Sequence, residues 1–262
     1  GRQMQTTVIL PCRNAPEILW LCWTHFLAYN ARDVAAVVVL DNASSAPVMS
    51  NVLDTMRSAG ATVIRHEENI GVWASINRGL ACCRTEAVLV LTSDLLLGPR
   101  AVTILQDVAQ QTDIPFLGPQ VVVGEPDLTK AHVLAMLPPG VNVNTGVYNG
   151  ACWLMNWPRL REEVGWFDPE FYVAYGDTDF VERMNLRQIR CGIVEGLPCI
   201  HLDKQSRRHD HTEEQDTAVE VRDYAHFAEK WHGNAEVLER HPPVSPMFYF
   251  SLKHDWQRQV AV

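Results

Sequence analysis

Short apolar runs alternate with helical patterns along the N-terminal part of the chain. Residues 34–40 form a continuous Val-rich run that ends at Asp41 and Asn42, as is typical of a parallel strand covered on both faces. The pattern predicts strands at 6–10, 34–40, 61–65 and 87–91, and helices at 17–29, 48–58 and 70–83. Asn69 is placed to cap the last of these helices. We therefore expect an α/β fold with an open, doubly wound parallel sheet flanked by helices.

The alternation of strand and helix patterns stops after Asp94, where Gly98 and Pro99 interrupt any regular secondary structure. Segment 115–146 is rich in Gly, Pro and Asn with only short Val runs, so this half is predicted to be α+β. We expect further strands at 150–157 and 189–200 and helices at 101–111, 158–164, 177–186 and 212–231. No linker stands out, which predicts a single domain over 1–262, with an N-terminal half at 6–97, a second half at 98–231 and a C-terminal tail at 232–262.

Composition narrows the class of protein. The 262 residues are 47% hydrophobic, and their formal net charge of -9 disfavours general nucleic-acid binding. The seven cysteines are odd in number and contain no C-x-x-C pair, which favours a reducing compartment and disfavours structural zinc. The longest apolar runs fall far short of the roughly 20 residues that a membrane span needs, and no secretory leader opens the sequence. We therefore expect a cytoplasmic protein without a membrane span.

Polar residues follow three of the predicted strands, at 11–14, 41–44 and 93–94. Any one of these groups alone is explained at least as well by a turn, because Asp, Asn and Ser bond their own backbone at strand ends. Ligands of open α/β sheets bind outside the carboxyl ends of the strands, so the coincidence of three such ends predicts a binding crevice. G-x-G-x-x-G, G-x-x-x-x-G-K-[ST], G-x-S-x-G and H-E-x-x-H are all absent, which disfavours dinucleotide, P-loop, α/β-hydrolase and zinc-protease chemistry.

Five motifs occur together in the order found in one enzyme family. They are VVVLDNAS at 37–44, ENIGVWASINRG at 68–79, LVLTSD at 89–94, GWFD at 165–168, and YGDTDF at 175–180 with Arg183. In this order the chain resembles the family 2 glycosyltransferases of the GT-A fold over residues 6 to 231, and looks closest to the rhamnosyltransferase-like branch. The resemblance implies a GT-A fold, with a Rossmann-like, mostly parallel sheet in a nucleotide-sugar-binding half and an α+β acceptor half. It also implies transfer of a hexose or deoxyhexose from a UDP- or dTDP-sugar to an acceptor hydroxyl. Inversion of the anomeric centre is part of what the resemblance implies.

The resemblance also implies a divalent metal, Mn2+ or Mg2+, that neutralises the leaving diphosphate. Asp94 matches the last carboxylate of the family's D-x-D motif, whereas Thr92 stands in place of the first. His201 matches an imidazole that the family often supplies to the metal. A single histidine at a strand end is equally well explained by a structural role, so both interpretations stay open.

The positions that match the family's nucleotide-sugar site lie mostly at the strand ends. Asp41 would accept a hydrogen bond from the nucleobase, and Gly71 would let the nucleotide approach closely. Asn77 is either a nucleotide contact or part of a polar helix face. The full set of expected nucleotide-sugar contacts is Pro11, Arg13, Asn14, Asp41, Gly71, Asn77, Ser93, Asp94, Gly150, Ala151 and Arg207. Arg207 belongs to a basic cluster with Lys204 and Arg208 that is either a loop clamping the diphosphate or a solvated surface.

Asp177 is the candidate general base, because the acceptor hydroxyl must lose its proton as the new bond forms. The family usually has Glu-Asp here, and Gly176 replaces the Glu. We read Asp179 first as a helix N-terminal acid and Asp168 as a turn residue. Trp153 and Trp157 either stack on a sugar or belong to the core.

Two alternatives to a working glycosyltransferase remain at this point. The missing carboxylates at Thr92 and Gly176 motivate a catalytically lapsed module that binds sugar nucleotides or glycans. A sugar-nucleotide pyrophosphorylase-like enzyme is disfavoured, because residues 12–16 lack the Gly-rich basic loop it needs. The sequence leaves the acceptor open among a glycan, a lipid-linked sugar and a protein.

Overall fold

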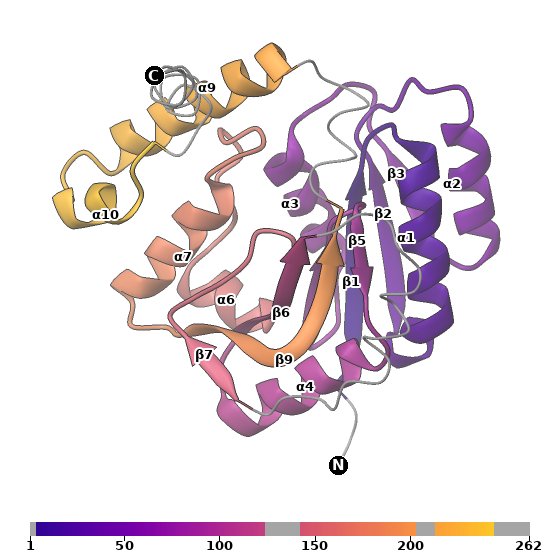
Figure 1. The fold of residues 1–262 in the computed structure, drawn as a ribbon, viewed down its shortest axis with the longest axis horizontal. Coiled ribbons are helices and arrows are strands. Elements are labelled where there is room, and N and C mark those ends of the chain that lie inside the picture. The colour runs from indigo at the N-terminus through magenta and orange to yellow at the C-terminus, as the bar shows by residue number, and fades with distance from the viewer. Residues whose placement is uncertain (1–3, 124–141, 203–212, 244–262) are drawn as a thin grey trace, which may run out of the picture.

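The computed structural model describes residues 4–123, 142–202 and 213–243, which form a mixed α/β fold around one nine-stranded sheet (Figure 1). The strand order is β3-β2-β1-β4-β8-β6-β9-β5, with β7 paired to β9 off this path. The strands are β1 (Thr6–Cys12), β2 (Ala36–Asp41), β3 (Thr62–Arg65), β4 (Ala87–Leu91), β5 (Leu95–Leu97), β6 (Phe116–Val123), β7 (Val143–Thr145), β8 (Cys152–Met155) and β9 (Cys191–His201).

The N-terminal half is the predicted parallel sheet. Strands β3, β2, β1 and β4 are mutually parallel, with Val8 of β1 opposite Val37 of β2 on one side and Leu89 of β4 on the other. Every residue of β1 and β4 is buried, as expected of apolar runs covered on both faces. The four strands predicted from the N-terminal pattern are therefore confirmed.

Beyond β4 the sheet is mixed, and here the sequence pattern missed three strands. β8 runs antiparallel to β4 and β6, whereas β6 is parallel to β9. β6 escaped prediction because Gly118 and Pro119 interrupt its apolar pattern, and the pairing with β9 shifts register between Pro119 and Gln120. The short β5 and β7 owe their extended form to antiparallel pairing with β9, a long-range contact that local patterns do not carry.

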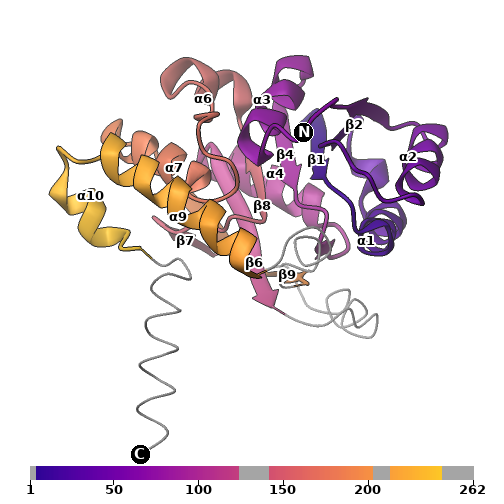
Figure 2. The same ribbon diagram turned by 90° about the horizontal axis from the view of Figure 1, so that it is seen from above.

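Helices cover both faces of the sheet, and two large apolar clusters lie between the helices and the sheet. One apolar cluster joins the sheet to α1 (Pro16–Tyr29), α2 (Met49–Ser58) and α4 (Ala101–Thr112). The other joins it to α3 (Val72–Cys82), α6 (Trp157–Glu163), α7 (Gly176–Leu186), α9 (Glu213–Lys230) and α10 (Ala235–Arg240). Figures 1 and 2 show α1 and α2 on the opposite side of the molecule from α9 and α10. No helix in the described ranges is long and apolar enough to cross a membrane.

The helix boundaries correct the sequence prediction in three places. Gly71, not Asn69, occupies the N-cap of α3, because the side chain of Asn69 instead accepts a hydrogen bond from the Gly71 amide, 3.1 Å away. Trp157 begins α6 and does not end a strand, because Asn156 accepts a hydrogen bond from the Arg159 amide and so caps the helix. α10 was not predicted at all; its six residues are too few for a periodic pattern.

Candidate active site

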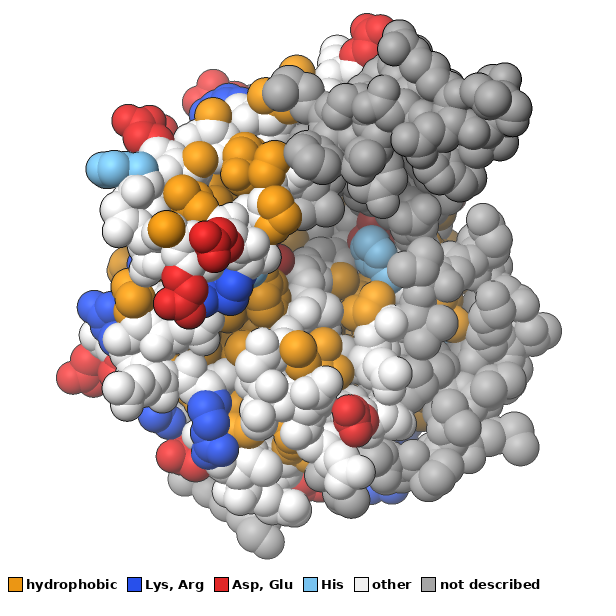
Figure 3. All heavy atoms as spheres, turned by 60° about the vertical axis from the view of Figure 1, so that its left-hand side comes forward, with side chains coloured by type: hydrophobic (Ala, Val, Ile, Leu, Met, Phe, Trp, Pro, Cys, Tyr) orange, Lys and Arg blue, Asp and Glu red, His pale blue; other side chains and the backbone are white. Residues whose placement is uncertain are grey.

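A cavity of about 550 Å³ opens at the carboxyl ends of β1 and β4. Figure 3 shows a hollow on this side of the molecule with hydrophobic side chains in its visible wall. The segments around the cavity are the end of β1, the start of α3, the turn after β4, the loop before β8, the loop before α7 and the end of β9. The predicted site residues among its lining are Pro11, Arg13, Gly71, Ser93, Asp94, Gly150, Ala151, Asp177 and His201.

Asp94 and His201 meet at one end of this cavity. The antiparallel pairing of β5 with β9 places Leu95 opposite His201, and the Leu202 amide donates to the Asp94 carbonyl at 2.9 Å. His201 Nε2 lies 3.4 Å from Asp94 Oδ1. The carboxylate is 7% exposed and the imidazole 22%, so both are reachable from the cavity while being held by the sheet.

Thr92 lies in the same turn, at the position where the family has its first carboxylate. Its hydroxyl oxygen is buried and makes no hydrogen bond to any part of the chain that the structure describes. Within these ranges no three His, Cys, Asp or Glu side chains gather into a group that could hold a metal ion by themselves. Any cation here would therefore need oxygen ligands from a bound substrate or water in addition to the Asp94–His201 pair.

Asp177 lies in the first turn of α7 and faces Gly150. A Cβ added to Gly150 would lie 2.6 Å from Asp177 Oδ2, so any larger residue would force the carboxylate out of its present position. Asp177 Oδ1 accepts a hydrogen bond from the Thr178 amide at 2.9 Å. Burial raises the pKa of Asp177, and this outweighs the opposing effects of the Thr178 amide and of His241. The result is a partly desolvated carboxylate that is more basic than one in water.

Gly176 shows why this chain has no acid before Asp177. A Cβ at Gly176 would overlap the indole ring of Trp73. That ring is fixed, because its Nε1 donates to the Val173 carbonyl at 3.0 Å and it stacks on Trp153 with centroids 6.1 Å apart. Trp73 therefore occupies the space that a longer side chain at 176 would enter.

The residues expected to bind the nucleobase divide into two groups. Asp41 is fully buried and pairs with Arg65, whose Nε lies 2.8 Å from Oδ2, and with the Ser44 hydroxyl. Asn14 accepts the Ser45 and Ala46 amides at 2.8 and 2.9 Å. Both side chains shape the loops after β1 and β2 from outside the cavity lining, whereas the predicted neighbours Pro11 and Arg13 line it.

Gly71 and Asn77 also take different places. Gly71 has φ +83°, and a Cβ there would lie 2.9 Å from the Tyr172 carbonyl oxygen, so glycine permits a close backbone approach at the cavity wall. Asn77 points to the other side of α3. Its amide donates to the Phe167 carbonyl at 2.8 Å and its oxygen accepts from the Phe167 amide at 3.2 Å. The described structure thus gives Asn77 a role in holding the 165–168 loop.

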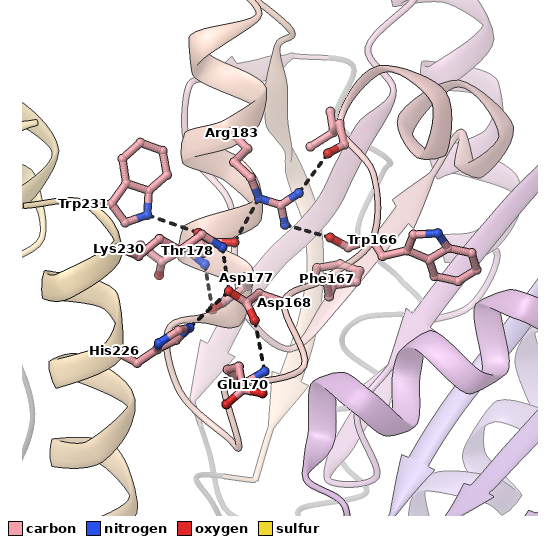
Figure 4. Close-up of polar contacts among 12 residues, drawn as sticks. Trp166, Phe167, Asp168, Glu170, Asp177, Thr178, Arg183, His226, Lys230 and Trp231 are labelled. Carbon is pink, nitrogen blue, oxygen red and sulfur yellow. Dashed lines mark hydrogen bonds and ion pairs between the residues drawn. The ribbon is translucent and has the colours of Figure 1, made fainter. Parts of the chain in front are cut away.

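Asp168 and Asp179 anchor helix α9 through side chains near its C-terminal end. Figure 4 shows Asp168 with its partners Lys230 and His226. Lys230 Nζ lies 2.6 Å from Asp168 Oδ2 and 2.9 Å from Asp179 Oδ1, and His226 Nε2 lies 3.1 Å from Asp168 Oδ2. Burial acts to raise the pKa of Asp168, but hydrogen bonds from Lys230, the Glu170 amide and His226 outweigh it and lower the pKa to about 2. Arg183 bridges Asp179 to the Val164 and Trp166 carbonyls, each at 2.9 Å.

The remaining candidate residues either lie in the core or fall outside the residues that the structure describes. The side chains of Trp153 and Trp157 are 1% and 2% exposed and belong to the core, although Trp153 also borders the cavity. Lys204, Arg207 and Arg208 lie outside the described residues, so their proposed contact with a diphosphate stays a prediction.

Asp223 was missed by the sequence reasoning. It is fully buried on α9, and its carboxylate accepts three backbone amides from the loop before α7. One clue was present: Asp223, Phe227 and Trp231 follow a spacing of four residues, so an acid lies on the apolar face of an amphipathic helix.

Comparison with known proteins supports the architecture. Residues 7–165 match the sequence model of Glycosyl transferase family 2. A curated relative, the low-salt glycan biosynthesis hexosyltransferase Agl10 of Haloferax volcanii, is 24% identical over 186 residues, which cover 64% of this chain and 59% of the relative.

Two solved structures share the fold at low sequence identity. GalNAc-T7, crystallised with UDP, GalNAc and Mn2+, superposes with a TM-score of 0.64 at 10% identity over 77% of this chain and 44% of its own. The mannosyltransferase PcManGT of Pyrobaculum calidifontis, in complex with GDP-Man and Mn2+, gives 0.62 at 16% identity over 95% of this chain and 69% of its own. These neighbours show a GT-A fold. With the family match extending over more than half of its residues, the chain belongs to Glycosyl transferase family 2.

Proposed function

We propose that the chain transfers a hexosyl or deoxyhexosyl group from a UDP- or dTDP-sugar to an acceptor hydroxyl, with inversion at the anomeric carbon. Family membership and the hexosyltransferase relative support the reaction class. The sequence resemblance to the rhamnosyltransferase-like branch supports a deoxyhexose. The acceptor is a glycan, a lipid-linked sugar or a protein.

The observation that carries the proposal is that Asp177 shares one cavity with Asp94 and His201. A transferase needs a base for the acceptor hydroxyl and a cationic environment for the leaving diphosphate within reach of one sugar. Gly150 and Ala151 line the same cavity as Asp177, where the donor sugar would lie.

Asp177 would act as the general base in a single displacement. The acceptor oxygen forms a bond to the anomeric carbon as the bond from that carbon to the diphosphate oxygen breaks, and the hydroxyl proton passes to the Asp177 carboxylate. The bonding electron pair leaves with the nucleoside diphosphate. Because burial raises the pKa of Asp177, its carboxylate is a better proton acceptor than an exposed aspartate.

Asp94 and His201 have the chemistry to hold a divalent cation. A carboxylate oxygen and an imidazole nitrogen 3.4 Å apart suit Mn2+ or Mg2+ when the diphosphate and water complete the shell. Such a cation would neutralise charge on the leaving diphosphate. Mn2+ is present in both structural neighbours described above, which supports this assignment.

The nucleotide would lie against Pro11, Arg13 and Gly71, next to Ser93. We assign Asp41 and Asn14 to the loops that shape this region; a direct contact between Asp41 and the base would require the nucleotide to displace Ser44 from the carboxylate. The neighbours carry UDP and GDP-Man, so the identity of the base is the first property to measure.

Thermal unfolding with UDP, dTDP, GDP, ADP and CMP, each with and without Mn2+, tests the donor site. A ligand at 100 times its dissociation constant adds about 2.7 kcal/mol, which raises the midpoint by roughly 5 to 10 °C for a chain of this size. We expect a metal-dependent shift with UDP or dTDP, followed by release of the nucleoside diphosphate when the matching sugar nucleotide and an acceptor are supplied. No shift with any nucleotide would contradict the proposal.

A catalytically lapsed binding module is the second candidate, favoured by two observations. Trp73 occupies the space that the family's acid before Asp177 would use, and Thr92 replaces a metal-binding carboxylate. This alternative predicts the same nucleotide shift without any turnover over the full panel of sugar donors and acceptors.

A further inference from the structure

Asp223 of α9 holds the backbone of the loop that leads into α7. Its Oδ1 accepts the Tyr172 amide at 2.9 Å, and its Oδ2 accepts the Val173 and Ala174 amides, both at 2.8 Å. The side chain is fully buried. A carboxylate is expensive to remove from water, and three charge-assisted hydrogen bonds to consecutive amides offset that cost. The loop and Asp223 therefore depend on each other.

Helix α3 holds the opposite, carbonyl side of the same loop. The Tyr172 carbonyl accepts the Val72 amide at 2.7 Å, and the Val173 carbonyl accepts Trp73 Nε1 at 3.0 Å. The loop is thus bonded to α9 through its N–H groups and to α3 through its C=O groups. Residues 172–175 form part of the cavity wall, so this double attachment shapes the cavity.

The geometry of this loop is passed directly to Asp177. Tyr175 has φ 60° and ψ -5°, a left-handed conformation that a bulky residue keeps only when its surroundings enforce it. The Tyr175 carbonyl accepts the Asp179 amide at 2.8 Å, which starts α7. Gly176, between them, lies against the Trp73 indole. A loop fixed at 172–174 and a helix fixed from 179 leave Asp177 little freedom.

We propose that Asp223 is a positioning residue for the transfer reaction: by holding the amides of residues 172–174 it fixes the Asp177 carboxylate at the cavity. The inference that Asp223 matters for transfer rests on the proposed function. The inference that it positions the loop rests on the hydrogen bonds described above. Asp223 itself lies outside the cavity lining and acts only through the loop.

Amide hydrogen exchange, resolved by NMR in the full chain, tests the positioning without any substrate. Asp223→Asn keeps the volume but turns an NH2 group toward amide donors. We expect exchange at Val173 and Ala174 to accelerate by about tenfold or more, together with exchange at Thr178 and Asp179 in the first turn of α7. Acceleration confined to 172–174 would show that the contact does not position Asp177 and would overturn the proposal.

Kinetics give the second readout. With the sugar nucleotide that the wild type uses, kcat of Asp223→Asn should fall by about tenfold or more, while the dissociation constant of UDP with Mn2+ changes by less than about threefold. A parallel loss of kcat, UDP binding and thermal stability would reduce Asp223 to a purely structural role and overturn the proposal.

Asp168→Asn is the matched control, because Asp168 also ties α9 to the preceding chain, but its partners are the Lys230 and His226 side chains and the Glu170 amide, not the amides of residues 172–174. It should lower the melting temperature while leaving exchange at 172–174 at the wild-type rate. If Asp223→Asn does not fold, native-state exchange of the wild type decides: residues 172–174 and 178–179 must open together, with the same denaturant dependence, and separate openings overturn the proposal. A wild type that turns over no donor refutes the proposed function but leaves the exchange result valid.

Discussion

Gly150 faces the carboxylate of Asp177 in the cavity wall so closely that a Cβ at position 150 would lie 2.6 Å from Asp177 Oδ2. The two residues come from different elements, the loop before β8 and the first turn of α7. This close approach means that the position of the candidate base is limited from two sides, by the loop that leads into α7 and by the glycine that the carboxylate faces.

Gly150→Ala should therefore reduce transfer more than stability. The added methyl group displaces the Asp177 carboxylate, and a misplacement of about 1 Å can lower a rate by about 100-fold. We expect kcat to fall by about 10- to 100-fold in a donor-turnover assay with UDP binding retained. Gly233→Ala is the matched control, since no atom lies within 4 Å of the Cβ it would introduce. Equal activity of the two variants would refute the steric argument.

Asp177→Asn should slow transfer strongly and stabilise the fold at neutral pH. Removing a general base lowers the rate by about 100- to 10,000-fold. Burial raises the pKa of Asp177, so the folded protein favours the protonated acid and loses stability as pH rises from the ordinary aspartate pKa through the raised one. The amide lacks this penalty, so we expect a higher melting temperature than wild type at pH 7 and a smaller difference near pH 4. A gain that is the same at both pH values would contradict the raised pKa.

Asp168 should show the opposite pH dependence. Its pKa is lowered to about 2, so its ionised form stabilises the fold above the ordinary aspartate pKa, and this contribution is lost as pH falls from about 4 towards 2. Asp168→Asn should cost about 1 to 2 kcal/mol at pH 7 by urea unfolding, and the difference should disappear near pH 2. Glu163→Gln is a suitable control, because its partner Arg159 and the carboxylate itself are both substantially exposed.

Asp94→Asn should remove the effect of Mn2+ on UDP binding. The neutral amide is a poor ligand for a hard cation, so the extra thermal shift that Mn2+ adds to UDP should vanish, while the shift from UDP alone stays. His201→Ala should weaken the Mn2+ effect less, because an imidazole can be replaced by water. A wild-type-like Mn2+ titration in Asp94→Asn would exclude Asp94 as a ligand.

The strands and helices of the parallel half could be predicted because each is marked by a pattern of neighbouring residues in the sequence. Strands such as β2 and β4 are short, continuous apolar runs, and the helices between them bury one face at a regular spacing. The second half was not readable in the same way. β6 contains Gly118 and Pro119, and β5 has only three residues, so pairing with β9 and not local propensity makes them strands.

The sequence by itself determined the fold class and the family, and it named nine of the residues that line the cavity, because the motifs that contain residues such as Asp94 and Asp177 occur in a fixed order along the chain. Only the tertiary structure decided which of those residues face the cavity. Asp41 and Asn77 belong to the same motifs, yet their side chains bond Arg65 and the Phe167 backbone. Burial and hydrogen-bond partners are set by residues distant in sequence, and no motif records them.

The same reason hid Asp223. In the sequence Asp223 is one acid among several on a charged amphipathic helix. Its role depends on hydrogen bonds to a loop that lies about 50 residues earlier in the chain. A buried carboxylate is stable only where donors converge on it, and that convergence exists only once α9 packs against the loop before α7. The sequence was enough to name the candidate site residues, whereas the contacts that hold them in place became visible only in the folded chain.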